Sequence, residues 1–163
     1  MMQKEVILSV RDLNVKFSLR GKVLHAIRGI SLDLYKGESL AIVGESGSGK
    51  SVFTKTFMGL LDNNGWVDSG TIQYHEYDLA KFKKEKEWIQ IRGKRIAMVF
   101  QDPMTSLNPL KTIGKQIQEA FTLHNKVSAE DAKKRTLELL ADVGIPEPEK
   151  RYKQYPHEFS GGM

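Results

Sequence analysis

The chain has 163 residues, is 40% hydrophobic and 28% charged, and carries a formal net charge of +5, which is the balance of a globular domain and excludes a disordered chain. It contains no cysteine, so a disulfide framework and a thiolate metal site are excluded. No stretch approaches the roughly 18 apolar residues of a membrane helix. The basic balance suits an anionic ligand or an anionic membrane surface, and a solvated basic face is the simpler interpretation. Because no other feature supports nucleic-acid binding, we expect no such partner.

The first forty residues predict an antiparallel β-layer. Short strands are expected at residues 6–10, 14–17 and 29–35, separated by turn-like pairs at 11–12, 20–21 and 36–37. Residues 39–43 (SLAIV) form an apolar run of the kind that marks a strand buried on both faces. After a glycine-rich segment, apolar residues recur at helical spacing from Val52 to Leu61, and this pattern ends near Gly65.

The second half of the chain alternates strand and helix signals before becoming helical. We expect a short strand at 70–79, a charged surface helix at 80–93 and a second buried strand at 95–100 (RIAMVF). Beyond Pro109, Ile113, Ile117 and Phe121 share one helical face, and a capping box at 128–131 starts another helix that ends before Gly144. The tail at 155–163 is expected to be a loop. Residues 1–107 are thus predicted to form an α/β core and residues 108–163 a helical subdomain.

A phosphate-binding loop is predicted between the strand at 39–43 and the following helix. Gly44, Gly49, Lys50 and Ser51 satisfy the pattern G-x-x-x-x-G-K-[ST]. Glycines allow positive φ, so that successive N–H groups can turn toward an anion, while Lys50 would neutralise β- and γ-phosphate oxygens and Ser51 would hold Mg²⁺. The alternative is a glycine-rich turn that happens to precede a helix. The predicted nucleotide-binding residues here are Gly44, Glu45, Ser46, Gly47, Ser48, Gly49, Lys50, Ser51 and Val52.

Two further segments, IAMVFQDPMTSLNP at 96–109 and the terminal FSGGM, follow the loop. Together the three resemble the nucleotide-binding domain of ABC transporters, in which a glutamine loop, a helical subdomain and an LSGGQ-like signature come in this order. The resemblance implies an α/β P-loop NTPase fold of the ABC type, with an antiparallel β-layer, an inserted helical subdomain and an incomplete C-terminus. Within the family, the segments look most like the oligopeptide, dipeptide and nickel importer branch.

The resemblance also assigns roles to residues outside the loop. Gln101 would contact Mg²⁺ or the attacking water and would act with Lys50 in catalysis. Ser160, Gly161 and Gly162 would bind the γ-phosphate of ATP held by a second ATP-binding subunit, although Phe159 and Met163 depart from the commonest signature. Phe17 lies where the family carries an aromatic residue that stacks on adenine. A core position for Phe17 on an alternating strand is an equal alternative.

The implied function is that of the ATP-binding subunit of an ABC importer, with ATP and Mg²⁺ as cofactors and oligopeptides as the transported class. Its implied partners are transmembrane permease subunits, a second ATP-binding subunit and, indirectly, a solute-binding protein, and its implied location is the cytoplasmic face of the membrane, as a peripheral subunit.

In the family, hydrolysis also needs an Asp-Glu pair and a switch histidine, which follow the signature, and this sequence ends at the signature. We therefore expect this chain to bind ATP without efficient hydrolysis. We also expect it to expose an apolar edge at 96–100, which a dimer contact would cover or which would lower stability. Two other interpretations stay open at this point. One is a kinase or GTPase with Asp102 as the magnesium-positioning acid, and the other is a nucleotide-binding or interaction module without turnover.

Overall fold

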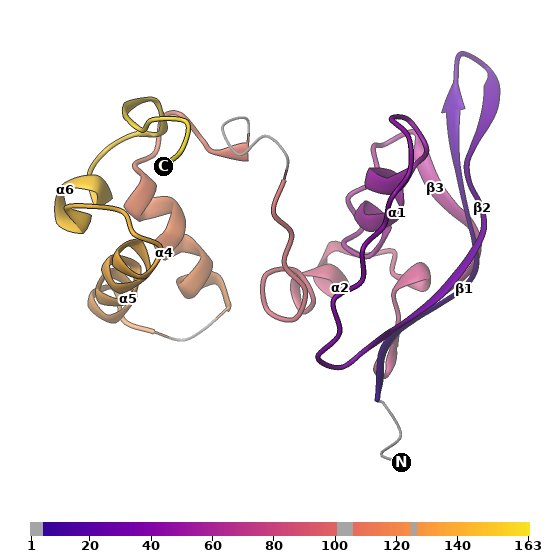
Figure 1. Cartoon of the computed structure of the whole chain (residues 1–163), viewed down its shortest axis with the longest axis horizontal. Helices are drawn as coiled ribbons and strands as arrows, with labels where there is room; N and C mark the ends of the chain where they lie inside the picture. Colours follow the sequence, from indigo (N-terminus) through magenta and orange to yellow (C-terminus); the bar gives the residue numbers. More distant parts are fainter. Residues whose placement is uncertain (1–4, 101–105, 125–126) are drawn as a thin grey trace. The chain divides into compact units, whose positions relative to one another are not determined.

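Two compact units, Met1–Arg92 and Gly93–Met163, make up the chain. The structure, a computed structural model, describes residues 5–100, 106–124 and 127–163 (Figure 1). The division predicted after residue 107, between an ATP-binding core and a helical subdomain, stays a prediction. None of the helices in the described ranges has the length and apolar composition needed to cross a bilayer.

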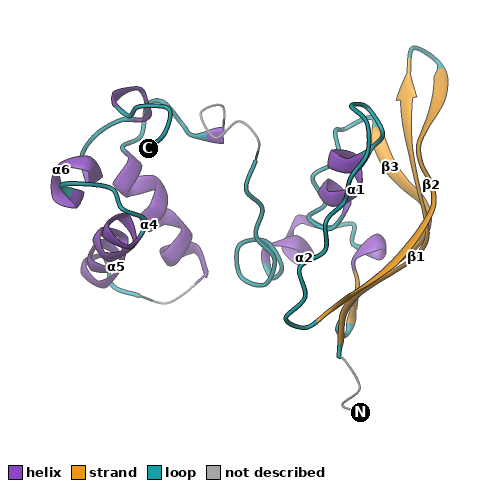
Figure 2. Cartoon of the chain, in the orientation of Figure 1, coloured by secondary structure: helices purple, strands orange, loops and turns teal. Residues whose placement is uncertain are grey.

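Unit 1 is built on an antiparallel sheet in the order β2-β1-β3-β4 (Figure 2). Its strands are β1 (Val6–Leu19), β2 (Lys22–Tyr35), β3 (Gly65–Tyr74) and β4 (Tyr77–Asp78). The expected antiparallel layer is confirmed, but the first forty residues form two long strands where three short ones were predicted. Arg20 and Gly21 form the hairpin turn between β1 and β2, both at positive φ, 47° and 76°, as such tight turns require.

A β-bulge replaces the turn that the sequence predicted at residues 11–12. Asp12 has a φ of 45°, and the pairing of β1 with β2 shifts register between Val10 and Leu13. Across the bulge, a Cβ on Gly70 would lie 2.5 Å from the carbonyl oxygen of Asp12, so this strand position requires glycine. The Asn14 side-chain amide stabilises the bulge by donating a hydrogen bond to the Asp12 carbonyl at 2.8 Å. The extra residue is therefore absorbed without breaking β1.

The core of unit 1 lies on one face of this sheet. The bulge changes the spacing of inward side chains on β1 from two residues to three, so the buried series is Leu8, Val10, Leu13, Val15 and Phe17. Two short helices, α1 (Lys50–Thr56) and α2 (Glu85–Ile89), lie on one side of the sheet (Figure 1). Phe53 of α1 and Trp88 of α2 are buried, and they bring the helices onto the core.

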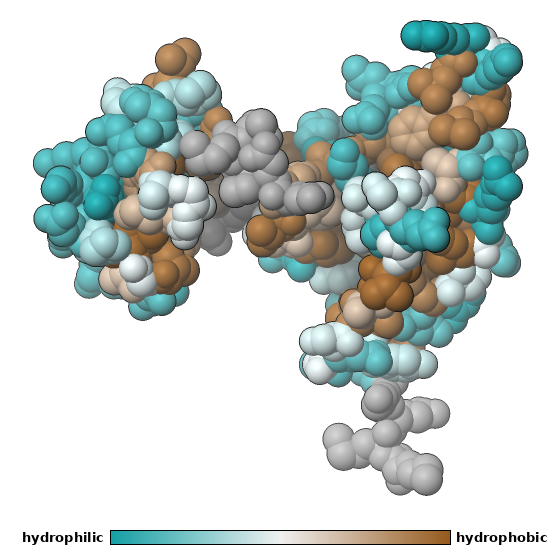
Figure 3. Space-filling view, turned by 45° about the horizontal axis from the view of Figure 1, so that its top comes forward, coloured by the Kyte–Doolittle hydropathy of each residue, from teal (hydrophilic) through white to brown (hydrophobic). Residues whose placement is uncertain are grey.

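The predictions of buried strands at 39–43 and 95–100 are wrong. Residues 38–45 and 97–100 form no strand, and Val43 and Val99 are 88% and 96% exposed. A run that is apolar on both faces needs paired neighbours on both edges and covering layers, and among the described residues the only sheet is the antiparallel one. The apolar edge expected at 96–100 is thus exposed, but as loop, and apolar side chains reach the surface of both units (Figure 3).

The segment between β4 and residue 93 is only partly helical. A 3₁₀ turn, η1 (Leu79–Lys81), precedes α2, and α2 has 5 residues where a longer surface helix was predicted. Its Trp88 is buried and packs edge-on against Phe82, with ring centroids 5.1 Å apart. The charge-rich composition concealed this aromatic pair. Trp88 also lies against Gly59, where a Cβ would be 2.3 Å from its ring, and this contact holds the segment against the rest of unit 1.

Unit 2 is helical, as predicted. It contains α4 (Ile113–His124), α5 (Ala129–Asp142), α6 (Pro148–Tyr152) and the 3₁₀ turn η2 (Pro156–Glu158). Of the capping box predicted at 128–131, the N-cap bond is confirmed, because the Ser128 hydroxyl accepts the backbone N–H of Asp131 at 3.0 Å. The Asp131 carboxylate accepts the Ser128 hydroxyl at 2.6 Å in place of the reciprocal bond of a box. Neither α6 nor η2 was expected. The core of the unit consists of Ile113, Leu140 and Ile145.

Candidate nucleotide-binding site

The glycine-rich loop at residues 44–49 leads directly into α1, which begins at Lys50. Gly47 and Gly49 have φ values of 80° and 91°, a region that side chains disfavour. The loop closes on itself where the Ser48 N–H donates to the Glu45 carbonyl at 3.2 Å. A Cβ on Gly44 would lie 2.8 Å from the Ser48 hydroxyl oxygen. The backbone conformation therefore favours glycine at Gly47 and Gly49, whereas a side chain at Gly44 would only require the Ser48 hydroxyl to move.

Strand β2 forms the wall that positions the end of the loop. A Cβ on Gly49 would lie 2.9 Å from Cδ1 of Ile27 and 3.0 Å from the carbonyl oxygen of Ala26. On the helix side, the Phe53 N–H donates to the Gly49 carbonyl at 2.8 Å, and Phe53 and Ile27 are both 2% exposed. Sequence reasoning did not single out Ala26 or Ile27. The only signal for them was the apolar alternation that continues along β2.

Lys50 folds back over the loop. Its Nζ donates to the carbonyl oxygens of Gly44 at 2.8 Å and Glu45 at 2.7 Å, and lies 3.4 Å from the Ser48 hydroxyl. A lysine ammonium has three donors on a flexible stem, so the same group can turn from these carbonyls to phosphate oxygens. Within the described chain, the N–H groups of Gly47 and Gly49 have no hydrogen-bond acceptor. The cradle thus offers free donors beside a positive charge, which fits a phosphate group.

A pocket of ≈ 260 Å³ lies between β2 and this loop. Ile27 and Phe53 supply an apolar wall, and Lys50 supplies a positive charge at the glycine end. No lining residue in the described part of the chain carries a carboxylate. The arrangement can hold an anion beside an apolar group, and no acid within it is placed to activate water.

Ser51, Val52, Phe17 and Gln101 are predicted site residues that lie outside the glycine-rich loop itself. Ser51 and Val52 follow Lys50 in the first turn of α1, with Ser51 exposed and Val52 half-buried. Phe17 is 9% exposed, and a Cβ on Gly65 would lie 2.5 Å from its ring. This matches the core alternative, and an adenine-stacking role stays a prediction. Gln101, like Asp102, lies outside the described residues.

The expected signature loop ends unit 2. Phe159 packs against the core of that unit, and the guanidinium of Arg151 lies 5.9 Å from its ring centroid. The larger ring is thus held at the position where the commonest signature has leucine. Ser160, Gly161 and Gly162 follow in an exposed turn, closed where the Met163 N–H donates to the Ser160 carbonyl at 2.9 Å. This turn leaves backbone groups accessible to a partner.

Comparison with known proteins identifies the family. Residues 27–163 match the family described as ABC transporter. The chain belongs to this family. Among curated ABC proteins, it is 53% identical over 161 residues to the oligopeptide transport ATP-binding protein AmiE of Streptococcus pneumoniae, covering 99% of this chain and 45% of AmiE. It is 51% identical over 160 residues to the dipeptide transport ATP-binding protein DppD of Bacillus subtilis, covering 98% of this chain and 48% of DppD. The chain thus spans about half the length of these relatives.

Solved ABC structures share the fold. The dimeric post-hydrolysis structure of the ATP-binding cassette MJ0796, bound to ADP and Pi, matches with a TM-score of 0.81 at 24% identity, covering 95% of this chain and 64% of that one. The structure of cbiO1 from Clostridium perfringens, part of the ABC transporter complex cbiONQ, matches with a TM-score of 0.69 at 26% identity, covering 98% and 57%. The P-loop fold of the ABC type, predicted as incomplete, is therefore confirmed.

Proposed function

We propose that this chain is the ATP-binding part of an ABC importer subunit. The single observation that carries the proposal is the glycine cradle, in which Lys50 Nζ lies at 2.8 Å and 2.7 Å from the carbonyls of Gly44 and Glu45. A lysine held over free N–H groups supports recognition of a polyphosphate. Family membership supports ATP as that polyphosphate and leaves the kinase or GTPase alternative without support.

The residues of the loop would act by binding and positioning. Lys50 would exchange its carbonyl contacts for phosphate oxygens, and the N–H groups of Gly47 and Gly49 would donate to the same phosphates. Ser51 would hold Mg²⁺ through its hydroxyl, and Gln101 would join it there. Bound Mg²⁺ supplies neutralisation of the charge that develops on the phosphate oxygens during transfer.

Peptide import is the output that the relatives support. The names of AmiE and DppD assign oligopeptide and dipeptide transport to those proteins, and identities above 50% extend the same substrate class to this chain as a proposal. In the whole protein we place the subunit at the cytoplasmic face of the membrane, against transmembrane permease subunits. A solute-binding protein would deliver the peptide to those permease subunits. A second ATP-binding subunit would contribute its own signature loop, as Ser160, Gly161 and Gly162 would contribute to the partner's site.

We further propose that the 163-residue chain binds ATP without efficient hydrolysis. The described residues that line the loop pocket include no carboxylate, so none of them can orient the attacking water as a general base. Because positioning supplies most of the catalysis in phosphoryl transfer, binding and turnover are separable here.

The decisive experiment measures Mg·ATP binding and phosphate release by this chain. We expect saturable ATP binding, no phosphate release above background and no preference for GTP. The Lys50→Ala variant should abolish ATP binding, whereas Lys55→Ala, a lysine substitution in the same helix outside the loop, should preserve it. Equal binding by the Lys50→Ala variant would refute the site. Rapid phosphate release would refute the separation of binding from turnover.

A further inference from the structure

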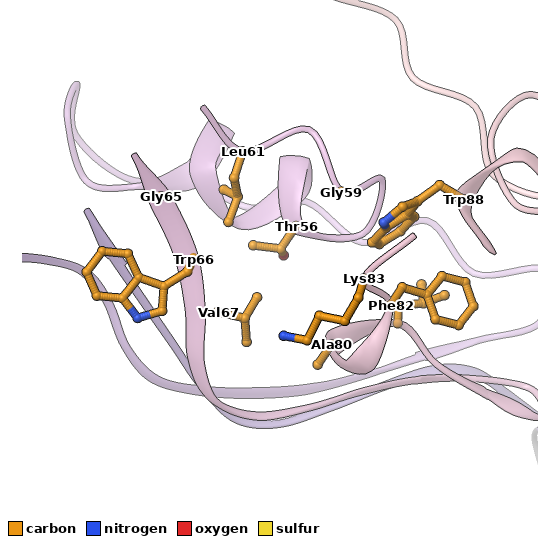
Figure 4. A pocket seen from close by; sticks show the side chains of 11 residues that line it. Thr56, Gly59, Leu61, Gly65, Trp66, Val67, Ala80, Phe82, Lys83 and Trp88 are labelled. Carbon is orange, nitrogen blue, oxygen red and sulfur yellow. The ribbon is translucent and has the colours of Figure 1, made fainter. Parts of the chain in front are cut away.

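Both tryptophans of the chain, Trp66 and Trp88, line one pocket of ≈ 230 Å³ in unit 1. Figure 4 shows Thr56 of α1, Val67 of β3 and Ala80 of η1 around the same space. Within the described chain, no residue lines both this pocket and the one at the phosphate loop. The two cavities are therefore distinct sites.

One wall of this tryptophan pocket is a fixed aromatic surface. The rings of Phe82 and Trp88 meet edge-on, with centroids 5.1 Å apart, and the guanidinium of Arg92 lies 5.4 Å from the Trp88 ring. Arg92 also donates to the carbonyls of Met58 at 2.6 Å and Gly59 at 3.0 Å. A Cβ on Gly59 would lie 2.3 Å from Trp88. The wall is thus held in place before any ligand arrives, which lowers the entropy cost of binding.

Lys83 brings a positive charge to the same pocket. Figure 4 shows its side chain running into the space, with its nitrogen on the side where Val67 lies. Its ammonium makes no ion pair or hydrogen bond with any residue that the structure describes, although the backbone of Lys83 is held by Glu87. Aromatic rings beside a free cation match a ligand that is apolar at one end and negative at the other.

The neighbouring carboxylates are occupied by other partners. Glu87 accepts the backbone N–H groups of Lys84 at 2.7 Å and Lys83 at 2.9 Å, and these bonds hold the pKa of its carboxyl below the ordinary value. Carboxylates on β3, β4 and α2 form ion pairs with other residues: Lys16–Asp68 at 2.7 Å, Lys81–Asp78 at 3.1 Å and Arg92–Glu85 at 2.6 Å. The charge of Lys83 is therefore available to a ligand.

We propose that the tryptophan pocket binds a small organic acid, with its apolar or aromatic body against Trp88 and Phe82 and its carboxylate on Lys83. A volume of ≈ 230 Å³ corresponds to about eight molecules of liquid water, so the pocket suits a compound with one ring. The ligand is recognised by an edge-on or stacked aromatic contact and by a charge-assisted hydrogen bond.

The two tryptophans provide the readout. The full chain is labelled with 5-fluorotryptophan and titrated with phenylacetate while its ¹⁹F spectrum is recorded, and Trp66→Phe assigns the two signals. We expect the Trp88 signal to shift with a single dissociation constant. The Trp66 signal should shift less, because the Trp66 ring lies across β3 from Val67 and Lys83 (Figure 4). Phenylacetamide, which has the same shape without the charge, should bind about tenfold more weakly. Shifts of equal size and midpoint with phenylacetamide, or no saturable shift at all, overturn the proposal.

Matched lysine variants test the role of the cation. Lys83→Gln should weaken phenylacetate binding about tenfold, whereas Lys86→Gln, on the exposed side of α2, should not change it. Lys83→Arg keeps the charge and should retain binding. The ¹⁹F spectra without ligand show whether each variant is folded. Unchanged affinity in Lys83→Gln, or an equal loss in Lys86→Gln, assigns the shifts to apolar contact alone and refutes the proposed site.

Discussion

Gly49 is the residue at which the geometry of the phosphate loop is most constrained. It combines a φ of 91° with contacts to β2 that leave no room for a Cβ, whereas Gly21, in the β1–β2 turn, has a φ of 76° and open space around it. Backbone strain and crowding therefore both disfavour a side chain at Gly49, whereas backbone strain alone disfavours one at Gly21.

We predict that Gly49→Ala destabilises unit 1 more than Gly21→Ala does. The left-handed conformation costs an alanine about 1–2 kcal/mol at either position, and crowding against Ala26 and Ile27 adds about 1–3 kcal/mol at Gly49. Urea titrations of the two variants measure the difference in the free energy of unfolding, and ATP titration should show a loss of binding only in Gly49→Ala. Equal destabilisation would contradict the tight approach of the loop to β2.

The chemical type of each loop residue was predictable from the sequence, but its neighbours were not. The pattern from Gly44 to Ser51 fixes where positive φ and a lysine occur, because those needs are local to the backbone. The contacts of Gly49 with Ala26 and Ile27 join segments more than twenty residues apart, and no local pattern specifies such a pairing. The same holds for Phe17, which local alternation places on a strand without saying what its ring faces.

At the scale of elements, an ion pair links the two longest strands. Arg11 of β1 donates to Asp33 of β2 at 2.7 Å, and this hydrogen bond is the main cause that holds the pKa of the Asp33 carboxyl below its ordinary value. A depressed carboxyl pKa stabilises the fold above the pKa of the unfolded chain, and that stabilisation is lost as pH falls through the folded pKa.

We predict that Asp33→Asn flattens the acid side of the stability profile. As pH falls below about 4, the free energy of unfolding of the original chain should decrease more steeply than that of the variant. Arg11→Ala should flatten the profile in the same way, because it removes the cause of the shift and keeps the carboxyl. The check is urea unfolding at pH 6 and at several values down to pH 2.5. Parallel profiles for all three proteins would show that the ion pair does not form in solution.

Helix α5 depends on its N-cap. Ser128 accepts the Asp131 N–H at 3.0 Å, and we predict that Ser128→Ala destabilises unit 2 by about 0.5–2 kcal/mol. Ser128→Asn retains a side-chain acceptor and should stay within a few tenths of a kcal/mol of the original, since asparagine caps as well as serine does. Unfolding of unit 2 followed by hydrogen exchange at α5 distinguishes the two variants. A similar loss in both would assign the effect to something other than the cap.

The elements that the sequence predicted correctly are those whose signals are local. The helical spacing of apolar residues predicted α4, and the capping residues at 128–131 predicted the start of α5. Gly144 marked the end of α5. The bulge at Asp12, the 3₁₀ turn η1 and the short α2 were not predictable, because each is fixed by partners across the sheet or by the burial of Trp88. The strands expected at 39–43 and 95–100 failed for the same reason, since a strand exists only where another strand pairs with it.

At the scale of the whole molecule, those unpaired apolar segments make self-association the expected behaviour. Val43 and Val99 are 88% and 96% exposed, and exposed apolar chain without pairing partners favours intermolecular contact. We predict that Val99→Glu lowers self-association, measured by analytical ultracentrifugation over a concentration series. Ser39→Glu adds the same charge without removing apolar surface and should have a smaller effect. If both variants behave alike, net charge and not the apolar segment controls association.

The two units differ in the optical signals they carry. Both tryptophans, Trp66 and Trp88, belong to unit 1, and the long helices α4 and α5, of 12 and 14 residues, belong to unit 2, whereas α1 and α2 have only 7 and 5. Indole emission therefore follows the sheet-based half, and circular dichroism at 222 nm chiefly follows the helical half. One denaturation run recorded in both channels shows directly whether the halves melt together or one after the other.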